Sequence, residues 1–173
     1  YSGGTQYYID SSSLRCRRQR DSHLQNENIF KPTMKRNRKI GAKEAALTNT
    51  TETTVRFSEV DSMQVVWHGE YVRYFEDGRE AFGRKYPGIG YLDFYANGYT
   101  APIVDMQLQY VLPLTINDVA IIETRFIEIT AAKLCFEYII RRKSDDALVA
   151  RGSSVQVFVD KEGNMCLNNP EFF

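Results

Sequence analysis

Asp61 and His68 are the two residues of this sequence whose types and spacing best suit acid–base chemistry. They flank the run SMQVVW within RFSEVDSMQVVWHGEYVRYFEDGREAFGR, residues 56–84. His23 is the only other histidine, and the sequence contains no GxSxG, P-loop or HExxH motif. If a helix begins near Val66, Asp61 and His68 lie at a strand-to-helix junction.

A carboxylate beside a helix N-terminus can support hydrolysis of an activated carbonyl. The free backbone N–H groups and the positive end of the helix dipole stabilise a carbonyl oxygen that becomes an oxyanion. The carboxylate either attacks the carbonyl carbon or activates the attacking water. The spacing leaves two structural alternatives open, because an aspartate before a helix is often its N-cap and a lone histidine among aromatic residues is often a packing residue.

The elements that would position these residues follow from periodicity. TETTVRFSEV, residues 51–60, is rich in β-branched residues and predicts a first strand. Apolar residues at spacings of three and four then predict a helix over residues 66–85, which Pro87 and Gly88 end. The stripe consists of Tyr71, Tyr74, Phe75, Gly78, Ala81 and Phe82. The glycine on this stripe predicts a close approach of the helix to a sheet.

Four alternating segments follow the helix and predict strands over residues 103–111, 118–129, 133–143 and 150–160. Short turns separate these segments, so neighbouring strands are expected to run antiparallel. One helix cannot cover both faces of such a sheet, and the sheet is therefore expected to curl around it. The predicted class is α+β.

The charge distribution divides the 173 residues into two parts. Residues 1–50 contain ten Lys or Arg and four Asp or Glu, a net charge of +6, whereas residues 51–173 contain twelve and eighteen, a net charge of −6. The polar, Ser- and Asn-rich first part predicts a disordered or appended basic leader, with Met34 as an alternative natural start. The acidic second part argues against nucleic acid as its main ligand.

The cysteines, Cys16, Cys135 and Cys166, are scattered and form no CxxC pair. This odd number predicts neither a disulfide framework nor a zinc site, and it favours a reducing, cytoplasmic setting. No apolar run approaches the roughly 18 residues that a membrane-spanning helix needs. No metal or other cofactor is predicted.

The segment RFSEVDSMQVVWHGEYVRYFEDGREAF resembles the signature of the hot-dog acyl-CoA thioesterases, specifically the 4-hydroxybenzoyl-CoA thioesterase-like family. The residues that fall on the family pattern are Phe57, Glu59, Asp61, Val65, Val66, Trp67, His68, Tyr71, Phe75, Glu76 and Arg79. The resemblance extends from about Thr53 to Phe173, so residues 51–173 are taken as one hot-dog thioesterase domain. Gln64 stands where the family has glycine, which raises the question of the local backbone shape.

This resemblance implies an antiparallel sheet of five or six strands wrapped around the central helix. It implies hydrolysis of an acyl-CoA or acyl-carrier-protein thioester, with Asp61 as nucleophile or general base. The backbone N–H of His68 would polarise the carbonyl and its side chain would assist. The implied substrate-binding residues are Gln64, Val65, Val66, Trp67 and Tyr71. Homodimers or homotetramers with sites at the subunit interface are also implied.

Two other functions stay open. Hot-dog proteins include acyl-thioester hydratases and dehydratases, whose motifs resemble HxxxPG or DxxxxH. Here Asp61 and His68 are seven residues apart and no proline follows. A non-catalytic acyl-CoA-binding module is the other alternative. The acyl group is not readable, since Trp67, Tyr71, Tyr91, Phe94, Tyr95 and Tyr99 suit either an acyl pocket or ordinary packing. Arg141–Lys143 likewise suits either CoA phosphates or a solvated turn.

Overall fold

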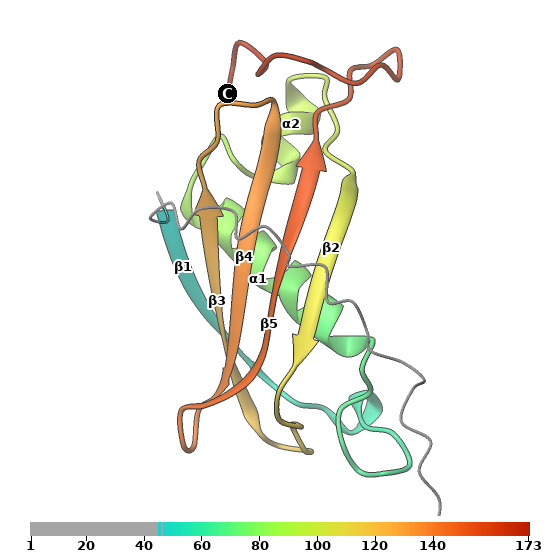
Figure 1. The fold of residues 1–173 in the computed structure, drawn as a ribbon, viewed down its shortest axis with the longest axis vertical. Coiled ribbons are helices and arrows are strands. Elements are labelled where there is room, and N and C mark those ends of the chain that lie inside the picture. Colours follow the sequence, from blue (N-terminus) through green and yellow to red (C-terminus); the bar gives the residue numbers. More distant parts are fainter. Residues whose placement is uncertain (1–44, 46) are drawn as a thin grey trace, which may run out of the picture. The chain divides into compact units, whose positions relative to one another are not determined.

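The structure, a computed structural model, describes residues 45 and 47–173. One long helix, α1 (Glu70–Lys85), lies against a five-stranded antiparallel sheet (Figure 1). The strands are β1 (Leu47–Thr54), β2 (Ile103–Tyr110), β3 (Val119–Ile127), β4 (Lys133–Arg142) and β5 (Ala147–Val157). A 3-10 turn, η1 (Phe57–Glu59), precedes α1, and a short helix, α2 (Tyr91–Ala96), follows it.

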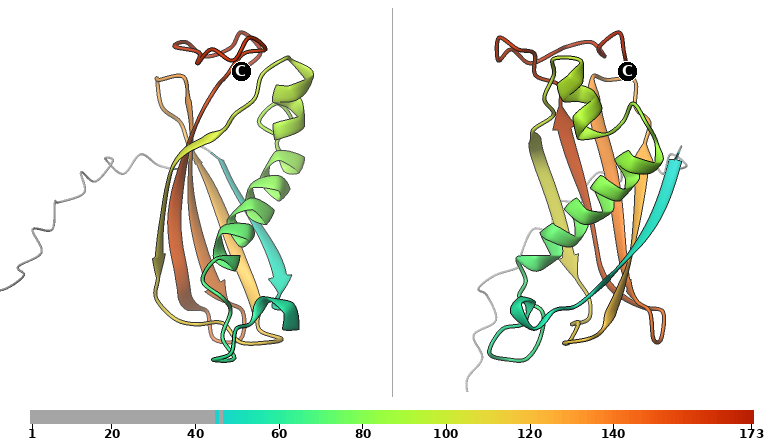
Figure 2. Two further views of the ribbon diagram at one scale, coloured as in Figure 1. Left: turned by 90° about the vertical axis from the view of Figure 1, so that its right-hand side faces the viewer. Right: turned by 180° about the vertical axis from the view of Figure 1, so that it is seen from behind.

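The strand order in the sheet is β1-β3-β4-β5-β2. β3, β4 and β5 are joined by short turns and pair antiparallel with their neighbours, as predicted. β2 pairs with β5 rather than with β3, so β1 and β2 form the two edges. The sheet curls around α1, which confirms the predicted wrapping (Figure 2).

The predicted apolar stripe is the buried face of α1. Its buried residues are Glu70, Tyr71, Tyr74, Phe75, Gly78 and Phe82. Phe75 stacks on Tyr138 of β4 with ring centroids 4.4 Å apart. A Cβ on Gly78 would lie 2.5 Å from Oγ1 of Thr124 on β3, so a larger residue at that position would push the helix off the sheet. The predicted close approach is therefore confirmed.

Two predicted boundaries are wrong by four residues. α1 begins at Glu70 rather than near Val66, because the preceding residues are extended and pair with other segments. The first strand begins at Leu47 rather than at Thr51, because Leu47–Thr54 pairs residue by residue with β3. Residues 47–50 therefore belong to the sheet, while residues 1–44 and 46 of the predicted leader lie outside the described residues.

Helix α2, which carries Tyr91, Phe94 and Tyr95, lies at the C-terminal end of α1, and η1 lies at the opposite end (Figure 1). Helix α1 has 16 residues, which corresponds to a length of about 24 Å. Phe94 of α2 is buried there, with its ring centroid 5.3 Å from that of Phe158 and 6.0 Å from that of Phe172. Phe94 is therefore a core residue, which favours the packing interpretation over an acyl pocket.

Candidate active site

A tight hairpin carries Asp61. Val60 and Val66 form an antiparallel bridge, and the backbone N–H of Asp61 donates to the carbonyl of Val65 over 2.9 Å. The N–H of Gln64 donates back to the Asp61 carbonyl over 2.9 Å, which closes the turn. Asp61 therefore lies opposite Val65, and Val65 is three residues before His68 in the sequence.

Gln64, which stands where the family pattern has glycine, adopts a backbone conformation that favours glycine. Its φ is +64°, in the left-handed region, where a residue with a Cβ is strained. A turn followed by one left-handed residue is a common way to close a short hairpin, and glycine adopts that conformation without strain. The turn therefore closes at Gln64 in spite of its Cβ, with the Gln64 N–H donating to the Asp61 carbonyl.

The carboxylate of Asp61 does not cap α1. The N-cap is Gly69, eight residues later, so the N-cap alternative is wrong. Instead, Oδ1 of Asp61 accepts the backbone N–H of Met63 over 2.8 Å and stabilises the hairpin turn. The second oxygen, Oδ2, accepts no hydrogen bond within the described residues, and Asp61 is partly exposed.

The chain between the hairpin and α1 is fixed by three backbone hydrogen bonds. The N–H of Val66 donates to the carbonyl of Leu114, and the N–H of Trp67 donates to the carbonyl of Glu59. The N–H of Glu70 then donates to the carbonyl of Trp67 over 2.9 Å. The intervening N–H groups of His68 and Gly69 donate no hydrogen bond within the part of the chain that the structure describes.

Both unpaired N–H groups belong to peptide units whose carbonyls are engaged. The carbonyl of Trp67, which shares a peptide plane with the His68 N–H, accepts the N–H of Glu70. The carbonyl of His68, which shares a plane with the Gly69 N–H, accepts the hydroxyl of Tyr110 over 2.9 Å. Two consecutive donors therefore have fixed directions at the start of a helix, where the helix dipole favours negative charge.

The side chains of Trp67 and His68 lie at the surface beside these donors. Their ring centroids are 4.8 Å apart, and the Trp67 side chain is 49% exposed. A Cβ on Gly69 would lie 2.0 Å from the Trp67 ring, so the indole covers this glycine closely. The His68 imidazole makes no hydrogen bond to any described residue, so no partner orients it as an acid or base.

Glu59 anchors the whole segment, a role that the sequence did not reveal. Its side chain is buried and accepts hydrogen bonds from the Tyr74 hydroxyl and the Arg56 backbone N–H, each over 2.9 Å. Its carbonyl accepts the N–H of Trp67. Its place on the family pattern was the only available signal, and a pattern position does not distinguish an anchor from a substrate contact.

The predicted substrate-binding residues fall into a buried group and an exposed or partly exposed group. Val66 and Tyr71 are 4% and 3% exposed, and the Tyr71 hydroxyl accepts the backbone N–H of Leu114 over 3.3 Å. Burial raises the pKa of Tyr71. Gln64 is exposed and Val65 is partly exposed. A substrate contact by any of these residues stays a prediction.

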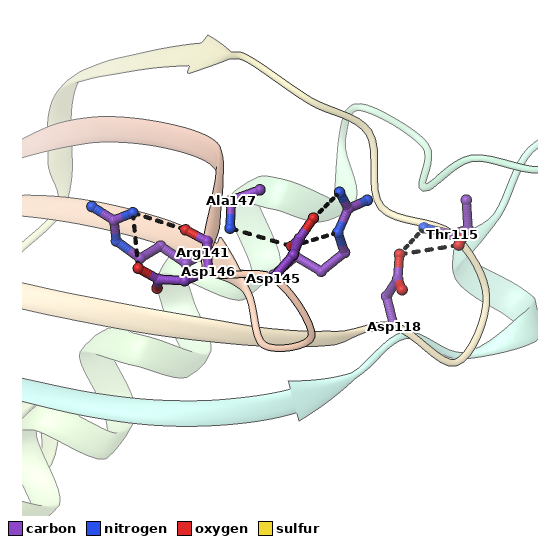
Figure 3. A network of polar contacts seen from close by, with 7 residues as sticks. Thr115, Asp118, Arg141, Asp145, Asp146 and Ala147 are labelled. Carbon is purple, nitrogen blue, oxygen red and sulfur yellow. Dashed lines mark hydrogen bonds and ion pairs between the residues drawn. The ribbon is translucent and has the colours of Figure 1, made fainter.

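The basic run Arg141–Lys143 covers the end of β4 and the start of the turn to β5, and its charges are paired. Figure 3 shows the pairing of Arg141 with Asp146. Nε and Nη2 of Arg142 donate to the two carboxylate oxygens of Asp145 over 3.0 and 2.7 Å, and this contact lowers the pKa of Asp145. Arg141 donates to the carbonyl of Asp146 over 3.0 Å. These pairs favour a solvated turn over a phosphate site.

Residues 45 and 47–173 contain neither a metal-binding cluster nor a membrane-spanning helix. No group of three or more His, Cys, Asp or Glu residues there is arranged to bind a metal ion. None of the helices found there is long and apolar enough to cross a membrane.

Comparison with known proteins identifies the family. Residues 55–172 match the model of the thioesterase-like superfamily. The chain belongs to the thioesterase-like superfamily. This thioesterase is 31% identical over 111 residues to "Putative acyl-CoA thioesterase YneP" of Bacillus subtilis (strain 168), a match that covers 64% of this chain and 79% of the relative.

Solved structures confirm the hot-dog fold of this thioesterase. A 1,4-dihydroxy-2-naphthoyl-CoA thioesterase from Synechocystis superposes with a TM-score of 0.66 at 18% identity, covering 73% of this chain and 92% of that one. A hypothetical protein from Aquifex aeolicus superposes with a TM-score of 0.64 at 26% identity, covering 71% and 94%. The family assigns the chain to the thioester hydrolases, which favours hydrolysis over the hydratase and binding-module alternatives.

Proposed function

We propose that this thioesterase hydrolyses acyl-CoA thioesters where the Asp61 hairpin meets α1. Asp61 supplies the carboxylate, and the N–H groups of His68 and Gly69 stabilise the oxyanion. The relative from Bacillus subtilis, named for acyl-CoA, and a structural neighbour, SAV2348 from Staphylococcus aureus, solved in complex with CoA, support this substrate class. Acyl-carrier-protein thioesters carry the same reacting group and form the second arm of the substrate test.

One observation carries the proposal. Two adjacent backbone N–H groups are unpaired within the described residues and held in direction by their own peptide carbonyls. Donors that are fixed before the reaction are the main source of oxyanion stabilisation in acyl transfer, because they need no reorganisation as charge develops. The hairpin brings a carboxylate with a free oxygen to the same segment.

Either of two routes produces the free acid and the thiol. In the general-base route, Asp61 takes a proton from water while the water oxygen bonds to the carbonyl carbon. The tetrahedral intermediate then collapses, the C–S bond breaks and the thiolate takes up the proton. In the nucleophilic route, an Asp61 oxygen bonds to the carbonyl carbon and expels the thiolate, and water then hydrolyses the mixed anhydride. Both routes place the developing oxyanion at the two N–H donors.

The substitution Asp61→Asn tests the carboxylate directly. Asparagine can accept the Met63 N–H as aspartate does, so the hairpin and the melting temperature should be retained. Turnover measured by thiol release should fall by about 10²–10⁴, the usual contribution of a positioned general base. Asp160→Asn is the matched control, because Asp160 accepts the N–H of Glu162 in the same kind of turn, over 3.0 Å.

Normal turnover in a well-folded Asp61→Asn variant would remove Asp61 from the mechanism. The assay should use acyl-CoA substrates of several chain lengths and the same acyl groups on carrier protein. Faster thiol release from the carrier-protein substrates would overturn the proposed preference for CoA while leaving the hydrolysis itself supported.

We also propose that the thioesterase is a homodimer paired along β2. This strand pairs with β5 on one side only, and its other edge has no partner strand within residues 47–173. Ile103 and Val104 on β2 are 36% and 58% exposed. An open, partly apolar edge strand is a template for pairing with a second copy. A monomer with full activity in sedimentation at micromolar concentration would contradict this proposal.

A further inference from the structure

Tyr110 links the edge of the sheet to the start of α1. It is the last residue of β2, and its hydroxyl donates to the backbone carbonyl of His68, 42 residues away in sequence, over 2.9 Å. Its ring meets that of Tyr71 edge to face, with centroids 5.3 Å apart and an interplanar angle of 83°. The ring contact fixes the position of the phenol, and the hydroxyl therefore reaches the carbonyl from a defined direction.

The bond to the His68 carbonyl also fixes the direction of the Gly69 N–H. A trans peptide unit is planar, and its C=O and N–H point in opposite directions within that plane. Rotating the plane moves both groups together. Gly69 has no side chain that would restrain this rotation, and its N–H makes no hydrogen bond among the described residues. Tyr110 is thus the one described side chain that donates a hydrogen bond to this peptide unit.

We propose that Tyr110 is a positioning residue that holds the Gly69 N–H in the direction needed to stabilise the oxyanion. The inference rests on the proposed function, in which this N–H is one of the two oxyanion donors. Tyr110 does not contact the reacting atoms in this scheme. It acts through the His68 carbonyl, and it restricts the peptide unit before the substrate arrives.

Tyr110→Phe isolates the hydroxyl because the phenyl ring keeps its contact with Tyr71. Removing an oxyanion donor outright costs about 10²–10³ in kcat, and a donor that is loosened but retained should cost less, about 10-fold. KM should change little, since the donor is used more strongly in the transition state than in the ground state.

Tyr86→Phe is the matched control. The Tyr86 hydroxyl also donates to a backbone carbonyl, that of Thr48, over 2.8 Å, at the opposite end of α1. Both variants lose one exposed phenol-to-carbonyl hydrogen bond, so they should have similar melting temperatures. Only Tyr110→Phe should lower kcat. Equal kcat for Tyr110→Phe and wild type, or an equal fall in both variants, would overturn the proposal.

The Gly69 amide signal in a ¹H–¹⁵N NMR spectrum provides a readout that needs no turnover. If Tyr110 restrains the peptide unit, Tyr110→Phe should shift or broaden this signal through exchange on the microsecond to millisecond timescale, and Tyr86→Phe should not. An unchanged Gly69 signal would overturn the proposal whatever the kinetics. Conversely, a wild-type protein that releases no thiol would overturn the proposed function, while the Gly69 signal would still decide whether Tyr110 orients this peptide.

Discussion

The Tyr74 hydroxyl donates a hydrogen bond of 2.9 Å to the buried carboxylate of Glu59, and this contact ties α1 to the segment that carries Asp61. The carbonyl of Glu59 accepts the N–H of Trp67, so one residue connects the helix to both sides of the hairpin. Burial, the hydrogen bond and the charge of Glu59 raise the pKa of Tyr74. The phenol therefore stays protonated and remains a donor across the pH range of enzyme assays.

His68→Ala should reduce turnover less than Asp61→Ala does. The alanine variant keeps the backbone N–H that serves as an oxyanion donor, and the imidazole has no described partner that orients it for proton transfer. Thiol release by the two variants under identical conditions checks this expectation. Equal losses would make the imidazole an essential acid or base.

Gly69→Ala should reduce both stability and turnover, because the added methyl would lie 2.0 Å from a ring atom of Trp67. Overpacking of this kind costs about 1–3 kcal/mol, unless the indole swings away from the helix start. The double variant Trp67→Ala/Gly69→Ala removes the clash. In a double-mutant cycle measured by melting temperature and kcat, the two changes should therefore couple favourably. Additive losses would show that the Trp67 indole does not restrict the size of the side chain at position 69.

Deleting residues 1–44 should leave folding and turnover close to wild type. The deletion leaves all eight residues of β1 and its pairing with β3 intact. A longer deletion that ends at Thr54 removes β1, exposes the edge of β3 and should prevent folding. Circular dichroism and thiol release measure both outcomes. A large loss on removal of residues 1–44 alone would show that the basic leader contributes to the folded enzyme.

The protein should lose stability at alkaline pH because the buried Tyr138 hydroxyl is harder to deprotonate in the folded state than in the unfolded state. Burial raises its pKa from 10.0 to about 12, despite the hydrogen bond with Ser154. Because the folded-state pKa lies above the unfolded value, the stabilisation is fully present below pH 10 and is lost as the pH rises towards 12. The loss between about pH 9.5 and 11.5 should be on the order of 2 kcal/mol.

Urea unfolding of wild type and Tyr138→Phe at those two pH values measures this contribution. The decrease in the free energy of unfolding should be smaller in Tyr138→Phe, since the other tyrosines contribute equally to both proteins. Tyr95→Phe, which changes a tyrosine that is 67% exposed, is the control and should behave as wild type. Identical pH dependence in wild type and Tyr138→Phe would contradict the expected effect of burial.

Regular spacing of residue types was sufficient to predict the helix and the strands that follow it. The stripe from Tyr71 to Phe82 predicted the buried face of α1, because a helix returns to the same side every three or four residues. Alternation predicted the strands after α1, because neighbouring side chains of a strand point to opposite faces. The motif around Asp61 predicted the hot-dog fold through resemblance to a family, a step that spacing alone did not support.

The hydrogen-bonding state of the groups at the junction depends on contacts between segments that are far apart in the sequence. Among the described residues, the N–H groups of His68 and Gly69 have no acceptor, whereas those of Val66 and Trp67 just before them donate to the carbonyls of Leu114 and Glu59. Tyr74 meets Glu59 across 15 residues and Tyr110 meets His68 across 42. Sequence periodicity reports local repeats, whereas these contacts depend on the register of the sheet and the docking of α1, which form only when the whole chain folds.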